Sequence, residues 1–244
     1  MKIKSGLLLL CLLVGLSARA QNWGGGVDDT NLHFGFTFQY LTSEYKILKK
    51  PDWRVSYVDP EMDPVGSLPL NAISSDSSPG FGIGFVVNKR LLENADLRFT
   101  PVLVFNDRVL TYHYFIEETK KDKTMEKKIS STLVEFPLSL KLKSDRRNNF
   151  RAYVLGGVKY STDISKKKKN EVTNPEETLV FNKRNFLSYE AGLGFDLYFE
   201  YFKMSPEIKL SYSFNSVLKP ELNRYAYPID KLMLRHVTFS LFFE

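Results

Sequence analysis

The chain has 244 residues, with 34 Lys and Arg against 28 Asp and Glu, and its formal net charge of +6 corresponds to a pI of about 9.1. Because the basic residues are spread among acidic ones, this small excess argues against a nucleic-acid-binding protein. The single cysteine excludes a disulfide within the chain, and His33, His113 and His236 each stand apart from a second metal ligand or nucleophile.

The first twenty residues have the pattern of a targeting signal. Two lysines precede an apolar stretch from Leu7 to Leu16, and Ala18-Arg19-Ala20 follows as a small-x-small cleavage site. The stretch is shorter than the roughly 20 residues that a transmembrane helix needs, and no later segment supplies such a run. We therefore expect a cleaved signal peptide over residues 1–20. No linker rich in Pro, Gly or Ser divides the remainder, so we expect one large domain over 21–244.

Apolar and polar residues alternate in eight segments of this domain, which is the period of a β-strand whose two faces differ. One face is rich in Phe, Leu, Val and Tyr, and the other in Gly, Ser and charged residues. The segments are 32–40, 81–88, 97–106, 134–143, 151–160, 188–199, 202–214 and 236–243.

The connections between these segments fall into two classes. Three are short polar turns, at Glu93-Asn94, Arg146-Arg147 and Glu200-Tyr201. The other four are long and cover residues 46–79, 107–130, 163–181 and 216–231. An even number of strands with short turns at one end and long loops at the other is typical of outer-membrane barrels. We therefore expect an all-β fold, an eight-stranded antiparallel transmembrane outer-membrane β-barrel with four long extracellular loops and both termini periplasmic.

Strand pairing across the tight turns tests this interpretation. The last of these turns sets Gly194 opposite Glu207 and Gly192 opposite Lys209, and all four residues lie on polar faces, as antiparallel pairing requires. The two glycines are expected to make room for the long side chains beside them.

The turn between the fourth and fifth segments, centred near Arg147, similarly sets Glu135 opposite Lys159 as an ion pair. A proline inside a strand removes a ladder hydrogen bond, and Pro101, Pro137 and Pro206 are therefore interpreted as β-bulges at the barrel rims.

The polar faces predict the contents of the lumen. Eight strands enclose little more than the volume of their own side chains, so the charged residues should form a packed ion-pair network that makes the barrel a plug rather than a pore. Structural neutralisation of buried charge is the favoured interpretation, because unpaired charges there would be costly; a proton path or substrate site is the alternative. The ten candidate lumen residues are Arg98, Glu135, Lys141, Arg151, Lys159, Glu190, Asp196, Lys203, Glu207 and Lys209.

The loops give no sign of catalytic chemistry. No compact Ser, His and Asp constellation is present, and we expect no catalytic residue, cofactor, metal site or small-molecule substrate. The run Lys166 to Lys169 is interpreted as a solvated loop, with an anion-binding patch for phosphorylated lipid headgroups as the alternative.

Six short motifs follow one another along most of the chain after the signal, and in this order they resemble the PorT family of Bacteroidota outer-membrane barrels. The motifs are Pro79-Gly80-Phe81-Gly82-Ile83-Gly84-Phe85, Leu97-Arg98-Phe99-Thr100-Pro101, Glu135-Phe136-Pro137-Leu138 with Lys141, Arg151-Ala152-Tyr153-Val154-Leu155-Gly156-Gly157, Ser205-Pro206-Glu207 and Phe239-Ser240-Leu241-Phe242-Phe243-Glu244.

The resemblance implies a non-enzymatic component of the type IX secretion system, which exports proteins such as proteases and gliding adhesins across the outer membrane. We therefore expect an accessory or assembly barrel that contacts outer-membrane lipid and other secretion-system membrane and periplasmic proteins. A structural or adhesive barrel acting through its extracellular loops is the main alternative, and an outer-membrane enzyme is the third.

Overall fold

The computed structural model describes residues 31–55, 70–116, 121–165, 180, 182–220 and 225–244. The predicted signal peptide with its cleavage site, and the run Lys166 to Lys169, lie outside these residues. In the described part of the chain, no helix is long and apolar enough to cross a membrane.

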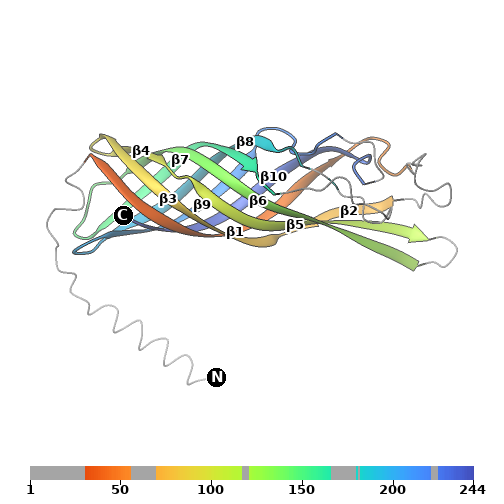
Figure 1. Ribbon diagram of the computed structural model, residues 1–244, viewed down its shortest axis with the longest axis horizontal. Coiled ribbons are helices and arrows are strands. Elements are labelled where there is room, and N and C mark those ends of the chain that lie inside the picture. The colour runs from red at the N-terminus through yellow and green to blue at the C-terminus, as the bar shows by residue number, and fades with distance from the viewer. Residues whose placement is uncertain (1–30, 56–69, 117–120, 166–179, 181, 221–224) are drawn as a thin grey trace, which may run out of the picture.

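The described residues form an all-β structure whose strands run diagonally around a cylinder (Figure 1). The strands are β1 (Leu32–Lys49), β2 (Leu70–Asp76), β3 (Ser78–Leu92), β4 (Ala95–Phe99), β5 (Val102–Ile116), β6 (Lys121–Lys143), β7 (Phe150–Asp163), β8 (Asn185–Tyr198), β9 (Lys203–Ser213) and β10 (Ile229–Phe243).

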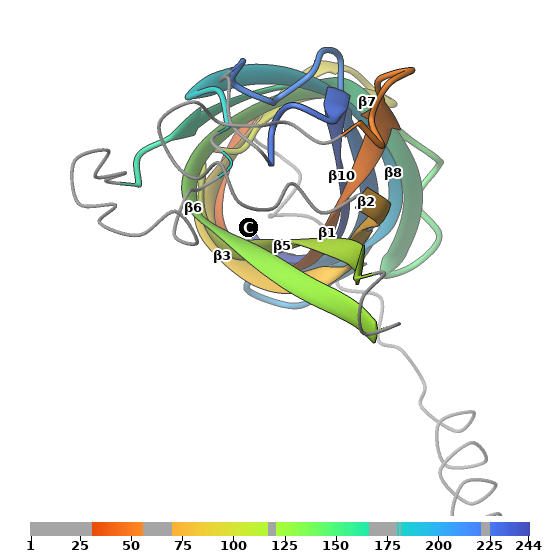
Figure 2. The same ribbon diagram turned by 90° about the vertical axis from the view of Figure 1, so that its right-hand side faces the viewer.

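The sheet closes on itself, because β1 pairs antiparallel with both β10 and β3. β2 and β3 both pair with β5, one after the other along its length. In the same way, β4 and β5 both pair with β6. Each of these two pairs therefore occupies one place in the wall. The result is a closed antiparallel ring of eight strands (Figure 2), which confirms the predicted fold.

The two ends of the barrel differ. Residues 93–94, 144–149 and 199–202 form short turns at one end, where the C-terminus also lies (Figure 1, left), and we name this the short-turn end. The opposite end, the long-loop end, carries the connections from β1 to β2, β5 to β6, β7 to β8 and β9 to β10.

Side chains alternate between the outside of the barrel and its lumen along each strand. In β1, Phe36, Phe38 and Tyr40 are exposed on the outer face, whereas Thr37 and Gln39 are buried. The apolar face predicted from the sequence is thus the outer face, and the polar face lines the lumen.

One predicted long loop is largely strand. Residues 107–130 continue β5 and β6 as a paired hairpin from Asp107 opposite Ser130 to Ile116 opposite Lys121, and this hairpin projects beyond the rest of the barrel (Figure 1, right). The alternation of polarity fails here because the inward residues Leu110 and Tyr112 are apolar. The sequence pattern therefore ends although the strands continue.

The predicted strand pairings hold at one hairpin and fail at the other. Gly192 lies opposite Lys209 and Gly194 opposite Glu207, as expected. Glu135 lies opposite Ser161, not Lys159, so the second register was wrong by two residues. The reason is that this turn is centred one residue later than assumed, at Asn148, whose φ of 54° lies in the left-handed region that Asn tolerates.

The three prolines do not form β-bulges, which corrects the prediction made for them. Pro137 lies opposite Lys159 and Pro206 opposite Leu241 without a shift in register. Pro101 lies in a break between β4 and β5, but both strands pair with β6 in the same register. Each proline therefore costs a ladder hydrogen bond without inserting an extra residue.

Candidate functional site

The lumen is the candidate site, because the described polar and charged side chains that are buried gather there. At the short-turn end, Lys141 donates to both oxygens of Asp196 at 2.7 and 2.8 Å, and Ser205 donates to the same carboxylate at 2.6 Å. Lys203 Nζ lies 2.7 Å from Glu244 Oε2. All of these charged side chains are buried, so each charge has a partner where water is scarce.

Arg98 connects this group to the next layer of the lumen. Its Nη1 lies 2.7 Å from Glu207, its Nη2 3.1 Å from Glu244, and its Nε donates to Asn88 Oδ1 at 2.9 Å. The planar guanidinium thus links β4 to β3, β9 and the C-terminal end of β10. The Phe242 ring lies 4.5 Å from the guanidinium carbon and closes the space beside it.

A second layer lies further along the lumen. Lys209 Nζ lies between Glu207 Oε1 at 3.5 Å and Glu190 Oε1 at 3.7 Å. Ser139 donates to Glu190 at 2.7 Å, and Tyr153 donates to Glu207 at 2.8 Å. Strands β6, β7, β8 and β9 are therefore joined through side chains in the lumen as well as through their ladders.

The third layer contains the pair predicted between β6 and β7. Lys159 Nζ donates to Glu135 Oε2 at 2.9 Å although the two residues are not directly opposite, because the long lysine side chain reaches diagonally across the ladder. Ser161 donates to Glu135 Oε1 at 3.3 Å, and Nδ1 of His236 lies 3.3 Å from Lys159 Nζ.

Nine of the ten predicted lumen residues are buried, and the structure brings them into the ion pairs described above. Arg151 is half-buried and lies opposite Asp196 in the β7–β8 ladder. Sequence reasoning missed Glu244 and the buried pair of Asp96 with Lys143, whose charged atoms are 2.7 Å apart. Lys143 was on a polar face, and Asp96 immediately precedes the segment that starts at Leu97; extending the alternation by one residue would have found the pair.

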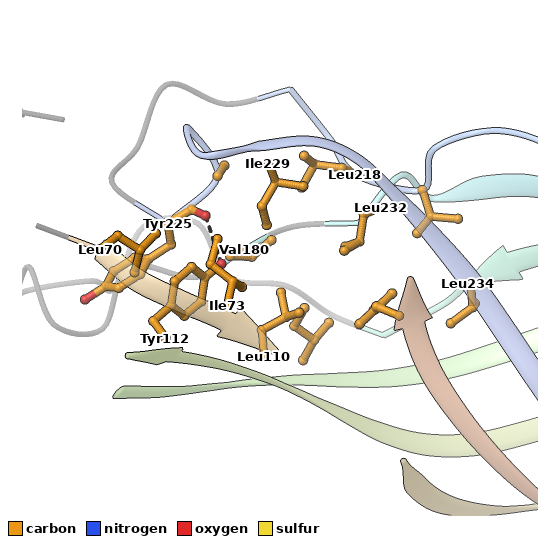
Figure 3. Packing of buried hydrophobic residues seen from close by; sticks show 14 of the residues in the cluster. Leu70, Ile73, Leu110, Tyr112, Val180, Leu218, Tyr225, Ile229, Leu232 and Leu234 are labelled. Atoms are coloured by element: carbon orange, nitrogen blue, oxygen red, sulfur yellow. Dashed lines mark hydrogen bonds between the residues drawn. The ribbon is translucent and has the colours of Figure 1, made fainter. Parts of the chain in front are cut away.

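The lumen is apolar toward the long-loop end, which the sequence analysis did not predict. Leu41, Val102, Val104 and Leu133 form a buried cluster just beyond the charged layers. A larger cluster continues toward the mouth of the barrel, where side chains from β2, β5 and β10 meet residues of the connection between β9 and β10 (Figure 3).

Residues of the connection between β9 and β10 pack into the mouth of the barrel. Tyr225 packs edge-on against Tyr112 with ring centroids 5.2 Å apart, and the Tyr112 hydroxyl donates to the Tyr225 carbonyl at 2.8 Å. Val217 and Leu232 are completely buried in the same cluster. The lumen is therefore filled by ion pairs toward the short-turn end and by two apolar clusters toward the long-loop end, with a buried polar layer around Arg108 between the two clusters.

This arrangement offers no obvious reaction chemistry. In the described ranges, no group of three or more His, Cys, Asp or Glu side chains could hold a metal ion. The buried carboxylates of the three charged layers are held by lysine or arginine, and they lie on the short-turn side of the apolar cluster around Leu41 and Leu133.

The outer face of the barrel is apolar. Large apolar side chains cover it, including Phe34, Phe85, Val154, Leu193 and Leu210, each more than half exposed. A closed barrel with an apolar exterior and a polar, ion-paired interior is the structure of a transmembrane β-barrel of the outer-membrane type, since the closed ring leaves no unpaired strand edge facing lipid.

The chain belongs to the outer membrane protein beta-barrel domain family, whose model matches residues 31–219. No curated protein sequence matches the chain. Among solved structures, it is similar to the outer membrane protein OprG from Pseudomonas aeruginosa, with 11% identity over 87% of this chain and 93% of that one and a TM-score of 0.45. It is also similar to Neisserial surface protein A, with 8% identity over 87% and 98% and a TM-score of 0.40. The N-terminal barrel domain of P. aeruginosa OprF gives 8% identity over 84% and 96% and a TM-score of 0.33.

Proposed function

We propose that this outer-membrane barrel is a non-enzymatic accessory or assembly component of protein secretion, and specifically of the type IX secretion system. The observation that carries the proposal is the obstruction of the lumen along its length, by buried ion pairs such as Lys141 with Asp196 and then by the apolar layer around Leu41 and Leu133. Eight strands leave no channel for a folded protein. A role in secretion must therefore be one of assisting a larger translocon.

The assignment to type IX secretion rests on the ordered motifs that resemble the PorT family. Four of the six motifs contribute charged residues to the ion pairs of the lumen. Arg98 lies in one and Glu207 in another, and these two side chains pair at 2.7 Å. The motif that starts at Glu135 supplies a further buried pair, with Lys159. The motifs thus describe how the barrel is filled, and they assign no catalytic role to any residue.

Partners would meet this barrel at its long-loop end or on its outer face. The projecting β5–β6 hairpin, with β2 paired along β5 from Leu70 to Asp76, extends beyond the lipid-facing belt and offers a rigid sheet to another protein. In the proposed orientation both termini face the periplasm and this hairpin faces the cell exterior.

Deletion of the gene in its host tests the proposal. Type IX cargo proteins should then remain inside the cell, and a plasmid copy of the intact chain should restore their export. Complementation by a chain carrying Glu135→Lys with Lys159→Glu should exceed complementation by Glu135→Gln alone, because the exchange keeps an ion pair in the lumen. Cargo export at wild-type levels after deletion would contradict the proposal.

The second candidate is a structural or adhesive barrel that acts through its exterior hairpin and loops. The length of the β5–β6 hairpin favours it, since a projecting sheet suits contact with surfaces as well as with a translocon. Loss of cell adhesion or envelope integrity with normal cargo export would support this candidate instead.

A further inference from the structure

The outer face of β1 and β10 changes character abruptly near the long-loop end. From Leu32 to Thr42 the outward side chains of β1 carry no charge, and they are joined on β10 by Phe239 and Val237. Ten residues of a strand tilted by about 40° span about 25 Å along the barrel axis, which matches the apolar belt of an outer-membrane barrel. The residues beyond Thr42 therefore lie at the level of lipid headgroups.

The first outward residues past this belt are charged. Glu44 lies opposite Arg235, with their charged atoms 3.2 Å apart. Lys46, two residues beyond Glu44, and Lys231, four residues beyond Arg235, are exposed on the same outward face at neighbouring levels of the β1–β10 ladder. Among the described residues, neither lysine forms an ion pair, so both ammonium groups are available to an anion.

More cations follow at the end of β1 and on the turn after it. Lys49 and Arg54 lie over the Trp53 ring at 4.1 and 4.9 Å, and Lys50 lies over the Tyr227 ring at 4.4 Å. The acidic residues in this region are few: Glu44 is paired with Arg235, Asp52 accepts a hydrogen bond from Tyr227 at 2.9 Å, and Asp230 is exposed. Among the described residues, the sector has six cations against three acids, and its Trp and Tyr rings are of the types enriched at membrane interfaces.

The opposite side of the barrel shows that this charge is not a general property of the rim. On β6 the outward face is uncharged from Leu142 to Thr132. Lys128 lies four residues beyond Thr132, just as Lys46 lies four residues beyond Thr42, so the two lysines are at equivalent levels. Lys128, however, is paired with Asp107 at 2.9 Å. The exposed lysine at this level of β6 is thus neutralised, whereas Lys46 and Lys231 on the β1–β10 side are not.

We propose that the outward face of β1 and β10 just beyond the apolar belt, with Lys46 and Lys231 at its centre and Arg235 beside them, binds the phosphorylated headgroup of an anionic lipid. Two ammonium groups at adjacent ladder levels can contact one phosphate from two sides. The apolar belt directly below accepts the acyl chains, so headgroup and chains are bound by contiguous surfaces.

Lipid binding by the purified full chain tests this proposal. Native mass spectrometry in a nonionic detergent would compare phosphatidylglycerol with phosphatidylcholine of identical acyl chains. We expect the intact chain to retain phosphatidylglycerol at least tenfold more tightly. Loss of each lysine should weaken this retention about fivefold, and the double change Lys46→Ser with Lys231→Ser on the order of 25-fold.

Lys128→Ser is the matched control, since it removes a lysine at the same level whose charge is already neutralised, and it should leave retention unchanged. Folded barrels migrate differently on gels before and after heating, and this difference would show that each variant is folded. If the double variant does not fold, the single changes Lys46→Gln and Lys231→Gln take its place. Equal retention of the two lipids, an equal loss in Lys128→Ser, or displacement of the lipid by an equal concentration of inorganic phosphate would overturn the proposal.

Discussion

At the residue scale, one glycine determines how tightly the lumen is packed. The Tyr153 ring lies across Gly194 from the neighbouring strand and donates its hydroxyl hydrogen to Glu207. A Cβ atom at position 194 would lie 2.5 Å from the tyrosine Cζ and hydroxyl oxygen and 2.8 Å from the Pro206 carbonyl oxygen. The space that the sequence analysis assigned to Glu207 is thus occupied by Tyr153, while Gly192 does lie against Lys209 as expected.

Gly194→Ala should therefore destabilise the barrel. Because the Tyr153 ring is buried between strands, it cannot move without breaking its bond to Glu207, and overpacking of this kind costs about 1 to 3 kcal/mol. Urea unfolding of the barrel in lipid vesicles measures the cost. Gly156→Ala is the control, since a Cβ atom there would meet nothing closer than 3.8 Å, and it should be neutral. Equal stability of the two variants would contradict the packing described here.

The buried ion pair of Glu135 and Lys159 should stabilise the barrel against unfolding. Glu135→Gln leaves the Lys159 ammonium without its carboxylate in the lumen, which should cost about 3 to 5 kcal/mol in the free energy of unfolding. Exchanging the two residues restores opposite charges and should recover most of the loss in the same unfolding experiment. If the exchanged variant is no more stable than Glu135→Gln, charge pairing is not what the site requires.

At the scale of the strands, the alternation of residue types predicted the ring and its two faces. It could do so because lipid and lumen impose opposite preferences on successive residues of a strand. The pattern did not predict the projecting hairpin of β5 and β6, where Tyr112 faces a hydrophobic core rather than a polar lumen. Nor could it fix the register of the β6–β7 hairpin, because that depends on the conformation of Asn148 and not on polarity.

The outward assignment of a strand can be tested at Leu193 in β8. This side chain is 51% exposed on the outer face, with Val154 and Ile208 opposite it on the neighbouring strands. Leu193→Arg would place a cation in lipid and should cost about 2 to 4 kcal/mol near the membrane midplane. Thr100→Ser in the lumen keeps the hydroxyl group and should be mild. If vesicle-embedded barrels tolerate both changes equally, the inside and outside of the wall have been assigned wrongly.

At the scale of the whole molecule, the lumen is filled by ion pairs toward the short-turn end and by two apolar clusters toward the long-loop end, with the polar layer around Arg108 between those clusters. The ion pairs of the short-turn half could largely be predicted, since charged residues on a polar face of a narrow barrel must find partners. The hydrophobic half could not, because it depends on Val217, Leu218 and Tyr225, which fold back into the mouth from a connection that has no strand pattern. Contacts of this kind join residues far apart in the sequence and leave no local periodicity.

The filled lumen makes the barrel a closed body that should conduct no ions. The most direct measurement is the single-channel conductance of the purified full chain in planar lipid bilayers. Insertion without a stable conductance above the level of the bare bilayer is the predicted result, because both the charged layers and the apolar layer around Leu41 and Leu133 exclude a continuous column of water. A large, stable open state would contradict the closed lumen and, with it, the accessory role proposed for this barrel.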